Sequence, residues 1–385
     1  MTARLGVVLA LLTAGAAALP PSPAVAQSAR SLLVDPSVRS TGMGGASTAV
    51  HSSDDVNGWA NPAVLGYLTG FGYRWNSTRL FPEPAPNVTF QSDRFSYGWG
   101  GVGLAIESHT LNYGQIELTD AQGSPIGSYE QTEDVRPLSG GISLSRTIEA
   151  VADLLAGAAP RFTRYADIAI GVSRKRVRLR LAPPAYQGVG RTIASDFGLL
   201  VRATPLPKTD TGRPFLDLSY GFAVLNHNDA QVVFVDEDRA DYVLRQYRNG
   251  ITARVGFPLS QGAAASLERH LGRWIARGMD PLVSVAVAAD FARYQLGPQQ
   301  RFGSGVDQVG VELVLANSLA VRFGHVGDEF SRIDDYSFGL GLGFSLADFA
   351  GARIDYARYP QSRGLSKLDR HAVAAWFDPV AFVRR

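Results

Sequence analysis

The clearest pattern in the chain is a strict alternation of large apolar and very small residues near its C-terminal end. From Phe338 to Leu346, every even position is phenylalanine or leucine, and every odd position is glycine or serine. A period of two is typical of a β-strand, because successive side chains point to opposite faces of a sheet. A soluble sandwich would bury the apolar face and carry charges on the other. Small residues inside and large apolar residues outside favour a barrel facing lipid, with something crowding its lumen.

Similar alternation recurs along most of the chain and predicts fourteen strands. Their expected ranges are 69–77, 89–99, 102–112, 136–146, 165–181, 191–204, 214–227, 243–257, 281–295, 305–316, 318–328, 333–346, 351–360 and 370–382. Nothing after residue 26 approaches 18 uninterrupted apolar residues, so any membrane span must be made of strands. The predicted fold class is all-β, a transmembrane antiparallel β-barrel of about 14 strands.

The connections between these strands alternate between short and long. Gly100 and Gly101 form a predicted two-residue turn that pairs Trp99 with Val102, because adjacent glycines suit the positive φ angles of such turns. Transmembrane barrels have short periplasmic turns and longer external loops. An even number of strands puts both termini, and the start of the N-terminal segment, at the periplasmic end. The expected external loops include 113–135, 182–190, 228–242, 296–304 and 361–369.

One hairpin also has a predictable register. Leu315 and Leu319 share the parity of the apolar, outward positions on their strands, and only a three-residue loop at 316–318 keeps both facing outward. The same register puts Glu312 opposite Arg322 in the lumen. Such a pair in partly wet surroundings contributes on the order of 0.2–1 kcal/mol.

Two periplasmic connections have helical rather than strand periodicity. Residues 148–157 place Ile148, Val151, Leu154 and Leu155 on one face, and residues 263–277 likewise gather their leucines, tryptophan and isoleucine. Short amphipathic helices of this kind can lie along the inner surface of a membrane. They can equally pack under the barrel mouth, and the sequence does not separate these two interpretations.

The stretch from Asp35 to Leu68 fits neither periodicity. It contains Gly42, Met43, Gly44 and Gly45 and then Asn61, Pro62 and Ala63, with scattered apolar residues between them. Glycine permits unusual backbone angles, and proline forces a turn. This composition predicts a compact irregular segment that lies inside the barrel or across its periplasmic mouth, with Asn61 hydrogen-bonded to the backbone.

This GMGG…NPA arrangement, placed directly before the first strand, resembles the N-terminal region of FadL/PorV-type outer-membrane proteins. The resemblance covers about 35 residues. It implies a fourteen-stranded barrel whose N-terminal segment plugs the lumen. A FadL-like role implies passive uptake of small hydrophobic compounds through a gated or lateral opening. A PorV-like role implies an accessory protein of a secretion system that binds or shuttles exported proteins at the cell surface.

The N-terminus has the features of a secretory signal peptide. Arg4 supplies the positive end, Leu5 to Leu19 the apolar core, and Ala24-Val25-Ala26 the small-residue cleavage site. The predicted organisation is therefore a signal peptide at 1–26, a plug or hatch segment at 27–66 and an outer-membrane barrel at 67–385. The predicted location is the bacterial outer membrane, with outer-membrane lipid as a partner.

A basic row lies at the far end of the fifth predicted strand. Arg174, Arg176, Arg178 and Arg180 share one face, directly beyond the apolar residues of that same face. Arginine binds phosphate through two parallel hydrogen bonds, so the row is a candidate contact for lipopolysaccharide. A solvated extension of the strand is the alternative interpretation.

No motif for catalysis, nucleotides or metals is present. The sequence lacks HExxH, GxSxG and P-loop patterns, its six histidines have no metal-ligand spacing, and cysteine is absent. The acidic pair Asp54-Asp55 is interpreted as solvated rather than cation-binding. The net charge of +2 gives no reason to expect a nucleic-acid partner. The chain is thus predicted not to be an enzyme and to need no cofactor.

Two functions from different classes remain open. The first is a plugged channel for hydrophobic small molecules, and the second is a secretion accessory that binds exported proteins. A continuous apolar pocket between plug and wall would favour the channel, and a large apolar patch on the external loops would favour the accessory. The sequence indicates neither a substrate nor an oligomeric state.

Overall fold

The structure is a computed structural model, and it describes most of the chain. The described residues are 29–51, 56–83, 85–157, 162–183, 188–208, 212–234, 240–297, 305–329, 331–347, 349–362 and 364–383. The signal peptide predicted at 1–26 and the acidic pair Asp54-Asp55 lie outside these ranges.

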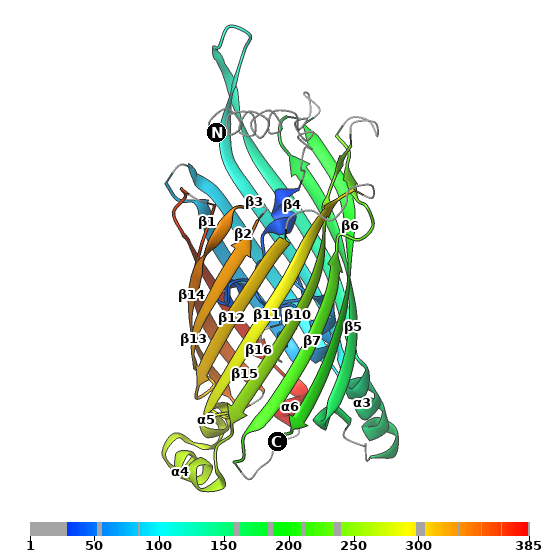
Figure 1. The fold of residues 1–385 in the computed structure, drawn as a ribbon, viewed down its shortest axis with the longest axis vertical. Coiled ribbons are helices and arrows are strands. Elements are labelled where there is room, and N and C mark those ends of the chain that lie inside the picture. Colours follow the sequence, from blue (N-terminus) through cyan, green and yellow to red (C-terminus); the bar gives the residue numbers. More distant parts are fainter. Residues whose placement is uncertain are drawn as a thin grey trace, which may run out of the picture.

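Among the described residues, fourteen antiparallel strands form one closed barrel, in which β1 pairs with β16 (Figure 1). The predicted fold class is confirmed. The wall strands are β1 (Gly70–Phe81), β2 (Ala85–Trp99), β3 (Val102–Thr119), β4 (Pro125–Ser143), β5 (Ala166–Arg180), β6 (Val189–Leu206), β7 (Phe215–Leu225), β10 (Leu244–Phe257), β11 (Val283–Leu296), β12 (Gly305–Leu315), β13 (Leu319–Asp328), β14 (Ile333–Leu346), β15 (Ala350–Tyr359) and β16 (Leu368–Phe377).

The alternation found in the sequence corresponds to the two faces of the wall. In β14, Leu340, Leu342 and Phe344 are exposed on the outer surface, whereas Gly339 and Gly341 are buried in the lumen. Similar outward rows of large apolar side chains occur on every side of the barrel. A closed sheet leaves no unpaired edge, so the whole outer surface consists of side chains and hydrogen-bonded backbone.

The two ends of the barrel differ. One end, here called the short-turn end, carries the tight turns at 100–101 and 316–318 together with the helices that lie outside the lumen. The other end is called the long-loop end. Gly100 and Gly101 both have positive φ and join Trp99 to Val102. Leu315 pairs with Leu319, across a loop in which Ala316 and Asn317 have positive φ.

The loop expected at 113–135 is largely a strand hairpin instead. β3 and β4 continue outward together, and their pairing ends at Thr119 and Pro125, so the hairpin rises above the rest of the barrel (Figure 1). The expectation failed because both faces of this extension are in solvent, which removes the apolar alternation used to recognise strands. Bulges at Asn112/Gly114 and Leu118/Thr119 further interrupt the period.

The predicted helices are present at the short-turn end (Figure 1). The first is α3 (Leu144–Ala156), and the second region forms α4 (Gln261–Leu271) and α5 (Arg273–Gly278), which are separated at Gly272. In α3, Ile148, Val151, Leu154 and Leu155 are all exposed, so this apolar face does not pack under the barrel mouth. A further short helix, α6 (Pro379–Val383), follows the last strand. None of the described helices has the length and apolar character needed to cross a membrane.

Residues 29–51 and 56–68 lie inside the barrel and are called the plug here. They contain η2 (Arg30–Leu33), α2 (Val38–Gly42) and η3 (Pro62–Tyr67). Ser37 caps α2 by accepting a hydrogen bond from Ser40 N at 3.2 Å, and Asn61 caps η3 with Pro62 at the first helical position. Most described side chains of the plug are buried.

The described plug begins near the long-loop end, not at the short-turn end as expected. Ala29 and Leu32 pack with Val135, Leu179 and Val232, near the ends of the strands at the long-loop end. The physical reason is that the loop carrying β8 (Gln231–Val232) and β9 (Asp241–Tyr242) provides apolar cover there. From this point the plug descends, and η3 reaches the wall beside the short turns.

Candidate functional site

The four residues of the GMGG motif lie against the wall formed by β12, β13 and β14. Gly44 and Gly45 have φ angles of 71° and 89°, which residues with a side chain rarely adopt. Gly44 N donates a hydrogen bond to Ser337 Oγ at 2.8 Å, and Ser337 Oγ donates to Gly42 O at 3.2 Å. Met43 is buried between plug and wall. The motif therefore makes a tight turn that fits directly on the sheet backbone.

The NPA motif occupies the opposite side of the lumen. Asn61 Nδ2 donates to Thr48 O at 2.8 Å and to Leu199 O at 3.0 Å, while its Oδ1 accepts from Ala63 N at 3.0 Å. The Asn61 side chain thus binds plug backbone, wall backbone and the start of η3 at once. Pro62 and Ala63 pack against β4, β5 and β6.

Ten strands present a glycine to the plug at these contacts, and we call this set the glycine girdle. At each girdle position, a Cβ atom would lie less than 3.0 Å from an atom of the plug. Only a residue without a side chain permits such a close approach of two backbones. The girdle residues are Gly98, Gly103, Gly141, Gly171, Gly198, Gly221, Gly250, Gly310, Gly324 and Gly339.

Glu312 and Arg322 face each other in the lumen, as the register requires. Arg322 Nε donates to Glu312 Oε1 at 2.7 Å, and Arg322 Nη1 donates to Asp355 Oδ1 at 2.6 Å. Arg39 of the plug adds a two-point contact to Glu312, at 2.9 and 2.5 Å. Arg322 is fully buried. The predicted pair is therefore part of a buried network of four charges that ties α2 to the wall, rather than a partly wet pair.

A second network holds the plug at Ser47 and Thr48. Asp290 Oδ2 accepts from Ser47 N at 2.9 Å, Thr48 N at 2.8 Å and Thr48 Oγ1 at 2.6 Å. Arg248 Nη2 donates to the same carboxylate oxygen at 3.0 Å and to Gly45 O at 3.1 Å. Asp290 is fully buried. Buried charges are tolerated only with partners of this kind.

Arg146 of α3 holds the lower end of the plug. Its Nη1 donates to Tyr67 O at 2.9 Å, and its guanidinium lies 5.0 Å from the centre of the Tyr67 ring. Burial raises the pKa of the Tyr67 phenol, and the nearby carboxylate of Asp167 raises this pKa further. Burial lowers the pKa of Arg146. Tyr67 is therefore neutral over the ordinary pH range, and its ring acts as a partner for a cation.

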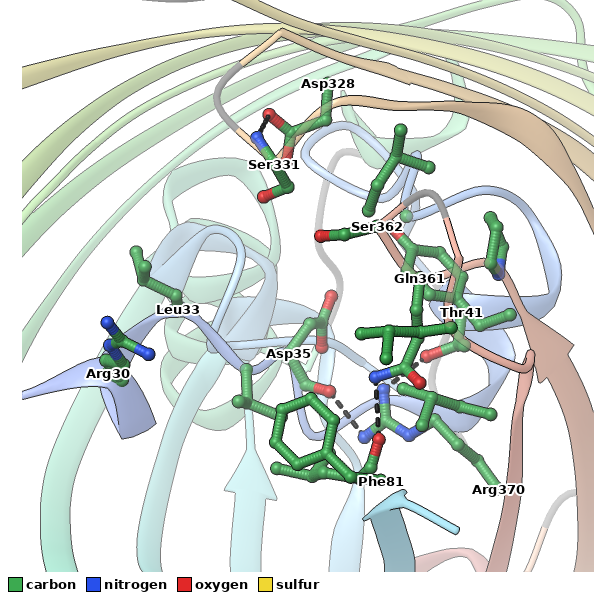
Figure 2. A pocket seen from close by; sticks show the side chains of 18 of the residues that line it. Arg30, Leu33, Asp35, Thr41, Phe81, Asp328, Ser331, Gln361, Ser362 and Arg370 are labelled. Atoms are coloured by element: carbon green, nitrogen blue, oxygen red, sulfur yellow. Dashed lines mark hydrogen bonds between the residues drawn. The ribbon is translucent and has the colours of Figure 1, made fainter. Parts of the chain in front are cut away.

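A cavity of about 360 Å³ lies between the plug and the wall, toward the long-loop end (Figure 2). Residues of two loops at the long-loop end border it, including Asp328, Ser331 and Gln361, and the chain around Asp35 and Thr41 lies at its inner side. Much of its lining is apolar and comes from both plug and wall, including Leu33, Val34, Val88, Leu111, Val306 and Leu368.

Arg370 connects the cavity lining to the plug. Its Nη2 donates to Asp35 O at 2.6 Å, its Nη1 to Thr41 Oγ1 at 2.7 Å and its Nε to Thr78 Oγ1 at 3.1 Å. Figure 2 shows the side chain of Arg370 beside Asp35 and Thr41 at one side of the pocket. The guanidinium is held by hydrogen bonds to the plug and the wall, so it forms a fixed polar edge on one side of the cavity.

The basic row on β5 lies on the outer surface, away from this cavity. Arg174, Arg176 and Arg178 are exposed, and Arg180 is half-buried with its Nη2 2.7 Å from Asp134 Oδ2. The structure therefore does not bring the row together with the plug motifs. Among the described residues, no group of three histidine, cysteine or acidic side chains could hold a metal ion.

Sequence reasoning missed Arg39, Arg248, Asp290 and Arg370, although they hold the plug in place. Each would have appeared as an isolated charge in an apolar strand or a glycine-rich segment. The available signal was their parity: Arg248, Asp290 and Arg370 fall on the inward face of their strands. There they stand next to small inward residues such as Gly250, Ala288 and Ala372.

Comparisons with known proteins give distant structural likenesses only. The chain matches no protein-family model and no curated protein sequence. A Pseudomonas aeruginosa FadL homologue is 9% identical, with 88% of this chain and 97% of that chain covered at a TM-score of 0.37. The Pseudomonas putida toluene transporter TodX is 10% identical, with coverage of 87% and 95% and a TM-score of 0.37. The CymD monoaromatic hydrocarbon channel is 10% identical, with coverage of 87% and 94% and a TM-score of 0.40. Such scores do not assign the chain to a family or an activity.

Proposed function

We propose that this chain is an outer-membrane channel for the passive uptake of small hydrophobic compounds. The observation that carries the proposal is the partly apolar cavity between the plug and the barrel wall. Its volume of about 360 Å³ falls within the range of small-molecule sites. For comparison, a cavity of about 150 Å³ lined by apolar side chains holds benzene. The cavity therefore suits compounds of roughly one or two rings.

The outer surface supports placement in a membrane. The outward residues form an apolar band around a closed barrel, and exposed aromatic side chains flank it near the short-turn end, where Phe71, Tyr97, Trp99 and Phe377 lie. Aromatic side chains at the membrane–water boundary are typical of transmembrane barrels. The exposed apolar face of α3 at the same end fits a helix that lies against the inner surface of that membrane.

The position of the cavity indicates a direction of entry. Its border is formed by the outer loops, so a compound arriving from the long-loop end meets the apolar lining first. Below it, the plug blocks the lumen. Onward passage requires release of the contacts that hold the chain at Asp35 and Thr41, and Arg370 makes two of these contacts. A compound can therefore occupy the cavity while the contacts of Arg370 keep the path beyond it closed.

The secretion-accessory function has less support. It predicts a large apolar patch on the outer loops. Among the described residues, the exposed large apolar side chains of these loops include Ile116 and Ile126 in the β3–β4 hairpin and Leu365 between β15 and β16. These are scattered over separate loops, so no single surface favours a protein partner.

Matched substitutions on one strand test the channel function. Val306 lines the cavity on β12, and Val309 on the same strand faces outward. Val306→Trp fills the cavity, whereas Val309→Trp adds an aromatic ring to the lipid-facing surface. The measurement is the initial rate at which Gram-negative cells carrying the protein take up radiolabelled naphthalene, relative to cells without it.

We expect the unaltered protein and Val309→Trp to raise the uptake rate equally, and Val306→Trp to reduce it to the background. Circular dichroism of the purified variants checks that each remains a barrel. Uptake by Val306→Trp at the full rate contradicts the role of the cavity. No uptake above background by the unaltered protein contradicts the channel function itself.

A further inference from the structure

Five arginines gather on the outer surface of β4, β5 and β6, toward the long-loop end. They are Arg136 on β4, Arg174, Arg176 and Arg178 on β5, and Arg191 on β6, and all five are exposed. The sequence pattern identified only those on β5. The other two join them because the sheet pairs three strands that are separate in the sequence.

The register places four of these five arginines in directly opposite pairs. Arg136 pairs with Arg176 across β4 and β5, and Arg178 pairs with Arg191 across β5 and β6. Neighbouring strands lie about 4.8 Å apart, and alternate residues on one strand lie about 6.7 Å apart. Like charges directly opposite each other destabilise a sheet. The arrangement therefore favours a bound anion that offsets the repulsion.

The protein supplies little negative charge of its own here. Asp134 shares this face and lies directly opposite Arg178, but its carboxylate oxygens accept hydrogen bonds from Arg180 at 2.7 Å and Thr110 at 3.0 Å. Glu130, farther out on β4, accepts from Asn112 Nδ2 at 2.6 Å. Within the described parts of the chain, none of the five guanidinium groups makes an ion pair or hydrogen bond.

The height of the patch on the barrel indicates what kind of anion fits. On β5, the exposed residues Ile168, Ile170 and Val172 lead directly to Arg174. Leu138 on β4 pairs with Arg174, so the apolar band of the neighbouring strand ends at the same level. The head group of a ligand bound here contacts the arginines. The part of the ligand that extends toward the middle of the barrel contacts apolar side chains.

We propose that this surface binds a phosphorylated glycolipid of the lipid A type in the outer leaflet of the membrane. Its phosphates are held by the arginines, and its acyl chains lie along Leu138 and Val172. Planar guanidinium groups hold phosphate through two parallel bonds, which lysine cannot do. The inference rests on the outer-membrane placement proposed above, but it does not depend on the cavity or on transport.

Other exposed arginines at the same end provide a matched comparison. Arg79 on β1, Arg293 on β11 and Arg358 on β15 are exposed on separate parts of the wall. Arg358 lies opposite Asp369, as Arg178 lies opposite Asp134, but none of these three arginines pairs with another arginine. If binding depended on net charge alone, removing the charges of Arg79, Arg293 and Arg358 would weaken it as much as removing three charges from the patch.

The test is native mass spectrometry of the full protein in detergent, titrated with bis-phosphorylated lipid A. One triple variant carries Arg174→Gln, Arg176→Gln and Arg178→Gln, and the control carries glutamine at Arg79, Arg293 and Arg358. Both variants lose three positive charges. We expect the Kd to rise at least tenfold in the β5 variant and to stay within twofold of the unaltered protein in the control.

Further arms identify the ligand group. We expect dephosphorylated lipid A and phosphatidylglycerol each to bind at least tenfold more weakly than bis-phosphorylated lipid A. Inorganic phosphate at millimolar concentration should not displace the bound lipid A.

Equal affinity of the two triple variants, equal binding of dephosphorylated lipid A or phosphatidylglycerol, or displacement by inorganic phosphate overturns the proposal. The naphthalene uptake assay is separate, so loss of transport with retained lipid A binding contradicts only the channel function.

Discussion

Asp290 is the most direct point at which to loosen the plug. Its Oδ2 atom accepts three hydrogen bonds from Ser47 and Thr48, and it also accepts one from Arg248. Asp290→Ala removes all four. The barrel wall around position 290 keeps its backbone pairing, because the substitution affects only the inward side chain.

The magnitude follows from burial. A hydrogen bond to a charged group contributes about 1.5–3 kcal/mol, and breaking a buried ion pair costs about 3–5 kcal/mol. Arg248 retains Gly45 O and Thr48 Oγ1 as acceptors, so we take the lower end, about 3 kcal/mol. At about 1.4 kcal/mol per factor of ten, the population with this plug segment detached should rise more than 100-fold.

Hydrogen exchange measures this population, because local opening exposes individual amides. We expect the amides of Ser47 and Thr48 to exchange more than 100-fold faster in Asp290→Ala, while the wall amides of β11 remain protected. Asp290→Asn, which keeps the shape and one acceptor, should give an intermediate change. Asp307→Ala is the matched control, because Asp307 is an exposed aspartate on the neighbouring β12.

Two results refute this reasoning. Unchanged exchange at Ser47 and Thr48 in a folded Asp290→Ala barrel means that the carboxylate does not hold the plug. Equal acceleration in Asp307→Ala means that the effect is a general loss of charge rather than the loss of this contact.

Two further substitutions test the plug motifs. Asn61→Ala removes the bonds to Thr48 O and Leu199 O, so it should loosen the plug and raise the swelling rate of proteoliposomes in arabinose; an unchanged rate counts against a sealing role. Gly171→Val places a side chain where the plug backbone is closer than 3.0 Å, and it should prevent formation of the native barrel as judged by circular dichroism. Gly327→Val is its control, since a Cβ atom there meets nothing nearer than 3.8 Å, and native folding of both variants would contradict the steric argument.

Parity explains why so much of the wall could be predicted from the sequence. A strand in a barrel must keep large apolar residues on one face, so the positions of most strands follow from alternation, although the ends of β3, β4 and β16 do not. The three-residue loop at 316–318 follows from the same rule, because a shorter loop would turn either Leu315 or Leu319 into the lumen. Where both faces of a strand are in water, as in the β3–β4 hairpin, no face needs large apolar residues, so alternation does not reveal the strand.

The contacts of the plug could not be predicted in the same way. Arg39 and Glu312 are 273 positions apart, and they meet only because the barrel closes around a segment with no period of its own. The sequence indicates that Glu312 needs a cation, and Arg322 on the next strand satisfies that need locally. Recognising Arg39 as a further member requires the position of the plug in three dimensions, and recognising Asp355 requires the register of β13, β14 and β15.

The glycine girdle has a consequence for how this chain can change over evolutionary time. At Gly171 or Gly310, any added side chain must be matched by a retreat of the plug backbone, and any enlargement of the plug must be matched by the wall. Each single step on its own produces a clash, although the reciprocal pair of steps would not. Mutations in two distant parts of the chain are therefore coupled, and the plug and the wall at that level are expected to diverge together rather than independently.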